Sequence, residues 1–294
     1  MGKRTRKDRW PELCERVAED DGLPTRSDVG AWTEDKLYYW NRYIEITTTA
    51  MVGNPKWRGG IVYVDLFAGP GICTLRETGR RIPGSALLAA WAPKPFDKIL
   101  VCEKDSALAD ACERRLAKTA IADRVNFFVG DCNSEIVRIE REIPESALVL
   151  AFVDPEGLHI HLETLETLAK KRRVDLLVLF ADRMDIVRNV DLYASQGESN
   201  LDRFLGHTSN WRQKWDGLNS RDPASVCKFF TELYKDQLVD RLGYSALTDE
   251  VMKSTRSALY RVVYASKHPL GLKFWNEISR IDRSGQRGLF SDGA

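Results

Sequence analysis

The sequence predicts an α/β fold in which a mostly parallel seven-stranded sheet carries helices on both faces. The first indication is that five apolar segments alternate with four helical segments between residues 61 and 182. Secondly, the apolar segments are continuous and rich in β-branched residues, as expected for strands covered on both faces. Thirdly, parallel strands need crossover connections, which the intervening helical segments supply.

The elements follow one another in a regular order along the chain. Strands are expected at 61–67, 98–105, 124–132, 147–157 and 174–182, with helices at 84–92, 106–119, 133–143 and 161–171 between them. Two late segments, 244–252 and 257–268, are typical of antiparallel strands that close such a sheet, and a last helix is expected at 268–281. Asp105 is expected to cap the helix that follows it.

The chain before the first strand is expected to hold two helices and a loop. Residues 8–22 can form a short helix, and 20–30 are interpreted as a loop because Gly, Pro and Ser interrupt them. A longer helix is expected at 33–53, with Thr33 as its cap.

We divide the chain into four parts, of which the third interrupts the alternation of strands and helices. The parts are an N-terminal tail with a short helix (1–30), the core with the first five strands (31–182), a helical insertion or lid (183–222) and the C-terminal part of the core with the last two strands (223–294). We expect the insertion to cover the pocket and select the substrate. Its Trp211 and Trp215 are interpreted as core residues, and its His207 as a capping or surface residue.

The composition indicates an ordinary globular protein. Of 294 residues, 43% are hydrophobic and 30% charged, and the net charge of +1 excludes a strongly basic chain while leaving a local basic face open. No apolar run approaches membrane-spanning length, and residues 1–10 contain no signal-peptide core, so a cytoplasmic protein without a membrane partner is expected. The six cysteines form no CxxC pair, which favours reduced buried thiols and no metal site.

The stretch "YVDLFAGPGICT" places an acid and two glycines where the first strand ends. Asp65 is followed by Gly69 and Gly71, which can adopt positive φ and bring the backbone close to a ligand. In sheets of this kind, ligands bind outside the carboxyl ends of the strands. The third glycine of a dinucleotide fingerprint is missing, and Asp65 would repel a pyrophosphate. The motif therefore favours a cationic, phosphate-free nucleoside, and S-adenosylmethionine (SAM) fits that description.

Three further strand ends also carry acids. Glu103 can accept hydrogen bonds from both ribose hydroxyls, Asp131 from the adenine amino group, and Asp154 would face the reactive methyl group. Together these acids predict a Rossmann-like class I methyltransferase fold. The expected cofactor site consists of Asp65, Phe67, Ala68, Gly69, Gly71, Glu103, Lys104, Asp131, Cys132 and Asp154.

A long connection, residues 72–85, separates Gly71 from the next helix. Arg76, Arg80 and Arg81 lie on it, near the expected mouth of the pocket. It is interpreted either as a basic flap that binds a phosphate-bearing substrate or as a solvated hairpin without a partner.

Six motifs in order resemble the three-Cys-motif partner (TcmP) family. They are "YVDLFAGPG", "IPGSALLAA", "EKDSALADACERRL", "VGDC", "FVDPEGL" and "YASKHPLGLKFW", and the resemblance covers residues 36–275. It implies a SAM-dependent, class I methyltransferase-like protein of bacteria or archaea. It also implies a partner protein that carries a three-cysteine motif and resembles radical SAM enzymes. The resemblance implies no particular substrate.

The family is distantly similar to amino-methyltransferases, whose fourth strand ends in Asp/Asn-Pro-Pro-Tyr/Phe. Asp154 and Pro155 match that motif, whereas Glu156 replaces the second proline and Gly157 the aromatic residue that stacks on a base. We expect Asp154 to orient the substrate or accept its proton, with Pro155 at the substrate. Glu156 is either an assisting general base or the first residue of the next helix.

The resulting prediction is a SAM-dependent methyltransferase that acts on nucleic acid or a nucleotide-containing substrate and releases S-adenosylhomocysteine (SAH). The alternative is a SAM-binding accessory subunit of the three-Cys-motif partner without methyl transfer of its own. The missing glycine and Asp65 disfavour an NAD-binding oxidoreductase.

Overall fold

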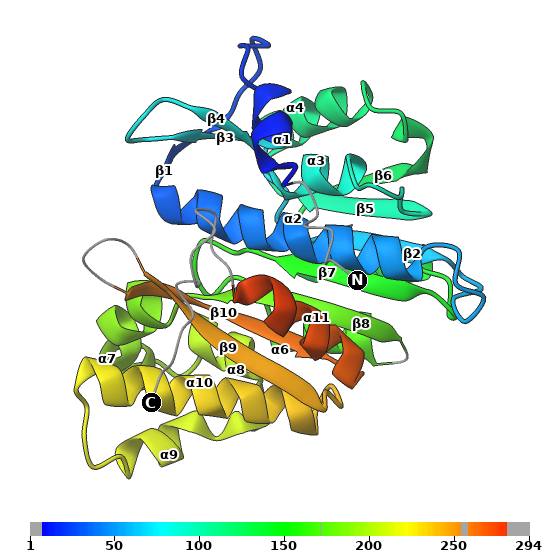
Figure 1. Ribbon diagram of the computed structural model, residues 1–294. Coiled ribbons are helices and arrows are strands. Elements are labelled where there is room, and N and C mark those ends of the chain that lie inside the picture. Colours follow the sequence, from blue (N-terminus) through cyan, green and yellow to red (C-terminus); the bar gives the residue numbers. More distant parts are fainter. Residues whose placement is uncertain (1–7, 171, 254–257, 281–294) are drawn as a thin grey trace.

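A computed structural model describes residues 8–170, 172–253 and 258–280 and contains the predicted seven-stranded sheet (Figure 1). The strand order is β6-β5-β2-β7-β8-β10-β9. Within this sheet β2, β5, β6, β7 and β8 are parallel to one another, and β10 is antiparallel to both of its neighbours. The strands are β2 (Ile61–Asp65), β5 (Lys98–Glu103), β6 (Val125–Val129), β7 (Leu148–Val153), β8 (Arg173–Phe180), β9 (Ala246–Lys253) and β10 (Ala258–Ser266). This arrangement confirms the predicted fold class.

Helices cover both faces of the sheet, and each face has its own hydrophobic core. One face carries α1 (Trp10–Glu15), α2 (Ala31–Met51), α3 (Ser85–Ala90), α4 (Ser106–Leu116) and α11 (Pro269–Ser279). The other carries α5 (Cys132–Arg141), α6 (Leu162–Ala169), α7 (Val187–Ser195), α8 (Asn200–Leu205), α9 (Trp211–Asp216) and α10 (Pro223–Asp240).

Strand β2 shows why the predicted strands are apolar without interruption. Val62 and Val64 are buried in one core, while Ile61 and Tyr63 are buried in the other. Because successive side chains of a strand point to opposite faces, both sets must be apolar when both faces are covered.

Helix α2 begins earlier than its predicted cap. Its N-cap is Gly30, which makes no side-chain cap bond, and Thr33 lies inside the first turn, so Thr33 is not the cap. A Cβ on Gly30 would lie 2.9 Å from Cδ1 of Trp32, so the close approach of this ring favours glycine at the cap. Asp105, by contrast, caps α4 as predicted, since its side chain accepts hydrogen bonds from the backbone N–H groups of Ala107 and Leu108.

A second, three-stranded sheet lies beside α1 and the start of α2 (Figure 1). It consists of β1 (Arg26–Val29), β3 (Ile72–Leu75) and β4 (Arg81–Pro83), with β1 parallel to β3 and β3 antiparallel to β4. The prediction that 20–30 is a loop is wrong for Arg26–Val29, because the partner of that short strand lies far along the chain. The connection after Gly71 is a paired hairpin, and α3 begins at Ser85 as expected.

The region after β8 is helical and starts with a π-helical turn, η2 (Asp182–Ile186). Trp211 and Trp215 are buried against Phe230 and belong to the core, as predicted. His207 is exposed at the start of a 3₁₀ turn, η3 (His207–Ser209). The expected tails at 1–7 and 284–294 lie outside the described residues.

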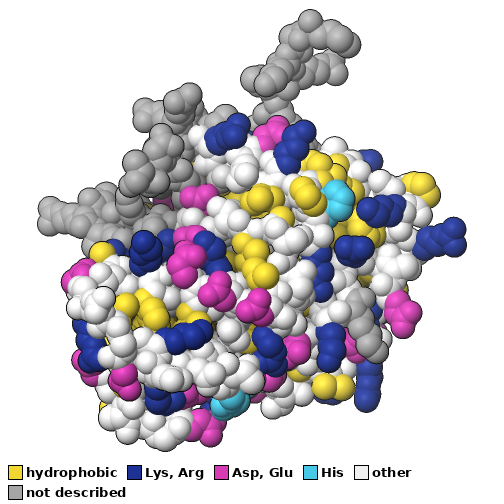
Figure 2. Space-filling view, turned by 90° about the horizontal axis from the view of Figure 1, so that it is seen from below, with side chains coloured by type: hydrophobic (Ala, Val, Ile, Leu, Met, Phe, Trp, Pro, Cys, Tyr) yellow, Lys and Arg dark blue, Asp and Glu magenta, His cyan; other side chains and the backbone are white. Residues whose placement is uncertain are grey.

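The surface carries mixed charges. On the face seen in Figure 2, Lys and Arg side chains are interspersed with Asp and Glu. Among the helices in the described ranges, none is both long and apolar enough to cross a bilayer. The six cysteines form no disulfide, and all but Cys73 are buried.

Candidate active site

A cavity of about 1700 Å³, here called the cleft, lies at the carboxyl ends of β2, β5, β6 and β7. Its walls include the turn after β2, the residues that follow the other three strands, and the first turn of α2. Drug-sized ligand pockets have volumes of roughly 300–1000 Å³, so the cleft has room for more than one small molecule.

The turn after β2, residues 66–71, forms the floor of the cleft. Gly69 and Gly71 have positive φ values of 59° and 83°, as the sequence predicts. A Cβ on Gly69 would meet no atom within 4 Å, so this glycine opens onto the cleft. Beneath the turn, buried Arg115 donates a 2.6 Å hydrogen bond to the carbonyl of Pro70 and pairs with Asp21. Sequence reasoning missed Arg115, because an arginine within a helix gives no sign of what it contacts.

The Glu103 carboxylate is held at the end of β5 by two backbone donors. Oε2 accepts a 2.8 Å hydrogen bond from the N–H of Gly69, and Oε1 accepts one of 2.8 Å from the N–H of Asp105. Each oxygen keeps a second lone pair, and Glu103 lines the cleft. The carboxylate is therefore fixed in place and still able to accept hydrogen bonds from a ligand.

Asp131 lies at the end of β6 and caps α5. Its Oδ1 accepts from the N–H of Asn133 at 3.0 Å, and its Oδ2 pairs with the Lys104 ammonium at 3.2 Å. Partial burial opposes ionisation, but the Asn133 N–H and the Lys104 charge together hold the pKa of Asp131 below its ordinary value. Asp131, Lys104 and the buried Cys132 all line the cleft.

Asp65 lies below the turn and is fully buried. Its carboxyl group accepts hydrogen bonds from the Tyr63 hydroxyl at 3.2 Å and the Phe67 N–H at 3.4 Å, and it also interacts with Ser85. Burial raises the pKa of Asp65 to about 7. The side chains of Phe67 and Ala68 border the cleft, whereas Asp65 supports the turn from underneath.

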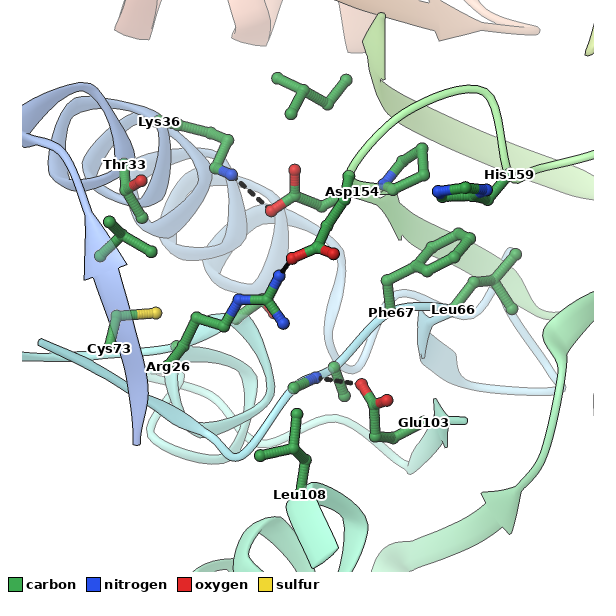
Figure 3. Close-up of a pocket in the computed structure, with 18 of the residues that line it drawn as sticks. Arg26, Thr33, Lys36, Leu66, Phe67, Cys73, Glu103, Leu108, Asp154 and His159 are labelled. Carbon is green, nitrogen blue, oxygen red and sulfur yellow. Dashed lines mark hydrogen bonds and ion pairs between the residues drawn. The ribbon is translucent and has the colours of Figure 1, made fainter. Parts of the chain in front are cut away.

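The Asp154 carboxylate at the end of β7 is paired with Lys36 (Figure 3). The Lys36 side chain is only 4% exposed, and its ammonium also lies 4.7 Å from the centroid of the Trp32 ring. Both residues belong to the first turns of α2. Sequence analysis did not identify either one, because a lysine and a tryptophan in an amphipathic helix normally indicate a solvated face and a core face.

Glu156 and Gly157, which differ from the amino-methyltransferase motif, have surroundings that the structure defines. Glu156 is exposed and pairs with Arg26 of β1, while α6 begins at Leu162 after the N-cap His161. The interpretation of Glu156 as the first residue of the helix is therefore wrong. A Cβ on Gly157 would lie 2.8 Å from Oδ2 of Asp185, so a larger residue there would require the Asp185 side chain to move.

The three arginines of the hairpin have different surroundings. Arg76 lines the cleft together with Arg26 and Arg203. Arg80 pairs with Glu34, and Arg81 pairs with Asp20 and Asp21 at 2.7 Å each. The hairpin thus brings Arg76 to the cleft and engages the other two in ion pairs within the protein.

The side of the cleft beyond Asp154 is largely apolar. Its lining includes Leu179 of β8, Met184 of η2 and Tyr260 of β10. The rings of Tyr260 and Trp32 lie 4.5 Å apart, centroid to centroid. The insertion contributes Asn200 and Arg203 to the lining of the cleft, and Arg203 lies near His161, which follows β7. Within the described ranges, no group of His, Cys, Asp and Glu side chains could hold a metal ion.

Comparisons with known proteins support the fold alone. No protein-family model matches the sequence, and no curated protein matches it. A Legionella pneumophila protein of the DUF519 family has a similar structure, with a TM-score of 0.51 at 12% identity, over 85% of this chain and 92% of that one.

Two solved methyltransferases are more weakly similar. An O-methyltransferase from Bacillus cereus, solved with SAH, has a TM-score of 0.45 at 14% identity, over 90% of this chain and 94% of that one. The methyltransferase domain of METTL16 has a TM-score of 0.46 at 11% identity, over 87% of this chain and 78% of that domain.

Proposed function

We propose that this protein is a SAM-dependent methyltransferase whose acceptor is nucleic acid or a nucleotide-containing molecule. The observation that carries the proposal is the order of Asp131, Glu103, the glycine turn and Asp154 along four neighbouring strands of the sheet. Asp131 suits an adenine amino group, Glu103 suits two ribose hydroxyls, and the open backbone at Gly69 suits a close ligand. The carboxylates among these groups would repel a pyrophosphate.

The chemistry requires alignment more than acid–base power. Bound SAM supplies a methyl group that the acceptor's lone pair displaces in line, while the sulfur keeps the bonding electrons and SAH is left. Asp154 would accept a hydrogen bond from an N–H or O–H of the acceptor and so orient its lone pair. The Lys36 ammonium keeps that carboxylate in place. Pro155 borders the acceptor, and Glu156, exposed at the rim, would take up the released proton.

The apolar side of the cleft supports a planar acceptor. Gly157 cannot supply the missing ring, whereas Trp32 and Tyr260 bring aromatic surface to the same region from α2 and β10. Aromatic side chains next to charged ones are typical of sites that accept an unstacked base. Arg76, which the hairpin brings to the wall of the cleft, would contact its phosphates.

A second candidate function is a SAM-binding accessory subunit without methyl transfer of its own. The pairing of Lys36 with Asp154 favours it, because that carboxylate is already engaged. The resemblance to the TcmP family implies a three-Cys-motif partner for such a subunit, and a bacterial or archaeal setting for either function. We propose a cytoplasmic location for both.

Transfer of a labelled methyl group from SAM to total RNA, DNA and protein tests both candidates. The methyltransferase proposal predicts label in the nucleic acid, and Asp154→Asn should lower the rate roughly 100-fold or more while SAM affinity changes less than tenfold. Label in no fraction, with SAM still bound, would contradict the first candidate and favour the second. The accessory function then predicts label only after the three-Cys-motif partner is added.

A further inference from the structure

The side chain of Thr33 is buried at the wall of the cleft without a hydrogen-bond partner. The residue is 3% exposed, and its Oγ1 has no partner among the described residues. Thr33 lines the cleft from the first turn of α2. A buried hydroxyl without a partner is unfavourable, so an unpaired one at the wall of a cleft points to a ligand that supplies the missing bond.

Lys36 lies three residues further on the same helix. Residues at this spacing are neighbours on one face of a helix, so Thr33 and Lys36 lie next to each other at the wall of the cleft. An ammonium has three donors, and the described structure uses one of them on Asp154. The first turn of α2 adds the partial positive charge of a helix N-terminus. This region therefore suits a carboxylate.

The position of this region matches one end of the proposed cofactor. In Figure 3, Thr33 and Lys36 lie on α2 at the upper left, Asp154 lies next to Lys36, and Glu103 lies lower in the view, near Leu108. If Glu103 holds the ribose and Asp154 faces the methyl group, the amino-acid end of SAM extends toward α2. That end carries an α-carboxylate.

We propose that Thr33 and Lys36 form the subsite for the α-carboxylate of SAM, with the Thr33 hydroxyl donating a hydrogen bond to it. Lys36 then shares its ammonium between this carboxylate and Asp154. The subsite rests on the proposed use of SAM, and it assigns to Thr33 a binding role that the sequence did not suggest.

A matched control lies on the same helix. Thr47 is 1% exposed, and its Oγ1 is also without a partner, but it does not line the cleft. Thr33→Val and Thr47→Val remove the same hydroxyl from the same helix at nearly constant volume. Only the first of them changes a residue that lines the cleft.

Isothermal titration of the full chain with SAM and with decarboxylated SAM, which lacks only the α-carboxylate, tests the subsite. Wild type should bind SAM at least about tenfold more tightly than the decarboxylated form, since a hydrogen bond to a charged group contributes roughly 1.5–3 kcal/mol. Thr33→Val should weaken SAM about tenfold and leave the decarboxylated form within twofold. Thr47→Val should change neither affinity, and Thr33→Ser should retain the affinity for SAM.

The outcomes separate this inference from the function on which it rests. Equal affinity of wild type for the two ligands overturns the subsite, whatever the stability of the variants. The subsite is also overturned if Thr33→Val binds SAM as tightly as wild type does, or if the variant loses affinity equally for SAM and for decarboxylated SAM. In either case the proposed function stands as long as wild type binds SAM. If wild type binds neither ligand, both the function and the subsite are wrong.

Discussion

The two sides of the cleft are assembled in different ways. The side that we assign to the cofactor comes from the consecutive ends of β2, β5 and β6, each with its polar residue directly after a buried strand. The side that we assign to the acceptor joins Trp32 of α2, the π-helical turn η2 and β10, which are far apart in the chain. Recognition of the nucleoside part of the cofactor thus depends on local motifs. Recognition of the acceptor, and of the carboxylate end of the cofactor by α2, depends on how distant segments pack.

The largest expected effect is on the cofactor side. Glu103→Gln replaces a carboxylate that can accept from two ribose hydroxyls, and each hydrogen bond to a charged group contributes roughly 1.5–3 kcal/mol, so SAM affinity should fall by roughly 100-fold or more. Titration calorimetry measures this change. Glu113→Gln, an exposed change on α4 outside the cleft, is the control and should leave affinity unchanged. An equal effect of both variants, or none from Glu103→Gln, would break the division of the cleft into two sides.

The second prediction concerns Asp65, which lies beneath the turn on the cofactor side of the cleft. Its folded pKa of about 7 lies above the ordinary value of 3.8, so the folded state retains a proton that the unfolded state loses. The resulting stabilisation is fully present below about pH 4 and is lost as the pH rises through about 7. Asp65→Asn imitates the protonated form and should be more stable than wild type at pH 8 by about 2 kcal/mol or more.

Chemical unfolding of wild type and Asp65→Asn at pH 4 and pH 8 checks this prediction. The difference between the two proteins should be small at pH 4 and grow toward pH 8, since the other buried acids are shared and cancel. A variant that is equally destabilised at both pH values would show that Asp65 is ionised in the folded protein.

Alanine substitutions at Gly69 and Gly53 distinguish an effect on SAM affinity from an effect on the stability of the backbone. Gly69 and Gly53 both have positive φ, 59° and 81°, and a Cβ at either would meet nothing within 4 Å. Each change to alanine should cost about 1–2 kcal/mol of stability, because the left-handed backbone is strained for residues other than glycine. Only Gly69→Ala places a methyl group in the cleft, so only this variant should also weaken SAM, by about tenfold. Thermal unfolding measures the stability of the two variants, and titration calorimetry measures their affinity for SAM.

The smallest effect is expected on the acceptor side. Tyr260→Leu removes a ring that packs on Trp32 and should raise the KM for the acceptor about fivefold, because aromatic pairs contribute roughly 0.5–1.5 kcal/mol beyond their buried area. Tyr260→Phe keeps the ring and should behave as wild type. Steady-state kinetics at saturating SAM measures the change. A weaker affinity for SAM in Tyr260→Leu would contradict the assignment of this side to the acceptor.

The features that could be predicted from the sequence are those that neighbouring residues in the chain determine. The positive φ of Gly69 and Gly71 and the capping role of Asp105 follow from local rules, and the alternation of strands and helices predicted the sheet. Glu103, Asp131 and Asp154 lie at the cleft because the carboxyl ends of parallel strands meet at one edge.

The rest depends on packing between distant segments. The ion pairs of Arg81 with Asp20 and Asp21, and of Lys36 with Asp154, join residues that no local pattern connects. Strand β1 was taken for a loop because four residues of mixed polarity form a strand only once β3 is beside them. Asp65 was expected next to a cationic ligand, yet its strand position turns it toward Tyr63 under the turn.

The central claim is that this edge of the sheet holds a cationic, phosphate-free nucleoside, and a parallel titration of the full chain with SAM and with NADH tests it most directly. The account predicts saturable binding of one SAM per chain, competed by SAH, and no binding of NADH. Binding of NADH, or no heat from SAM at concentrations that saturate known methyltransferases, would contradict it.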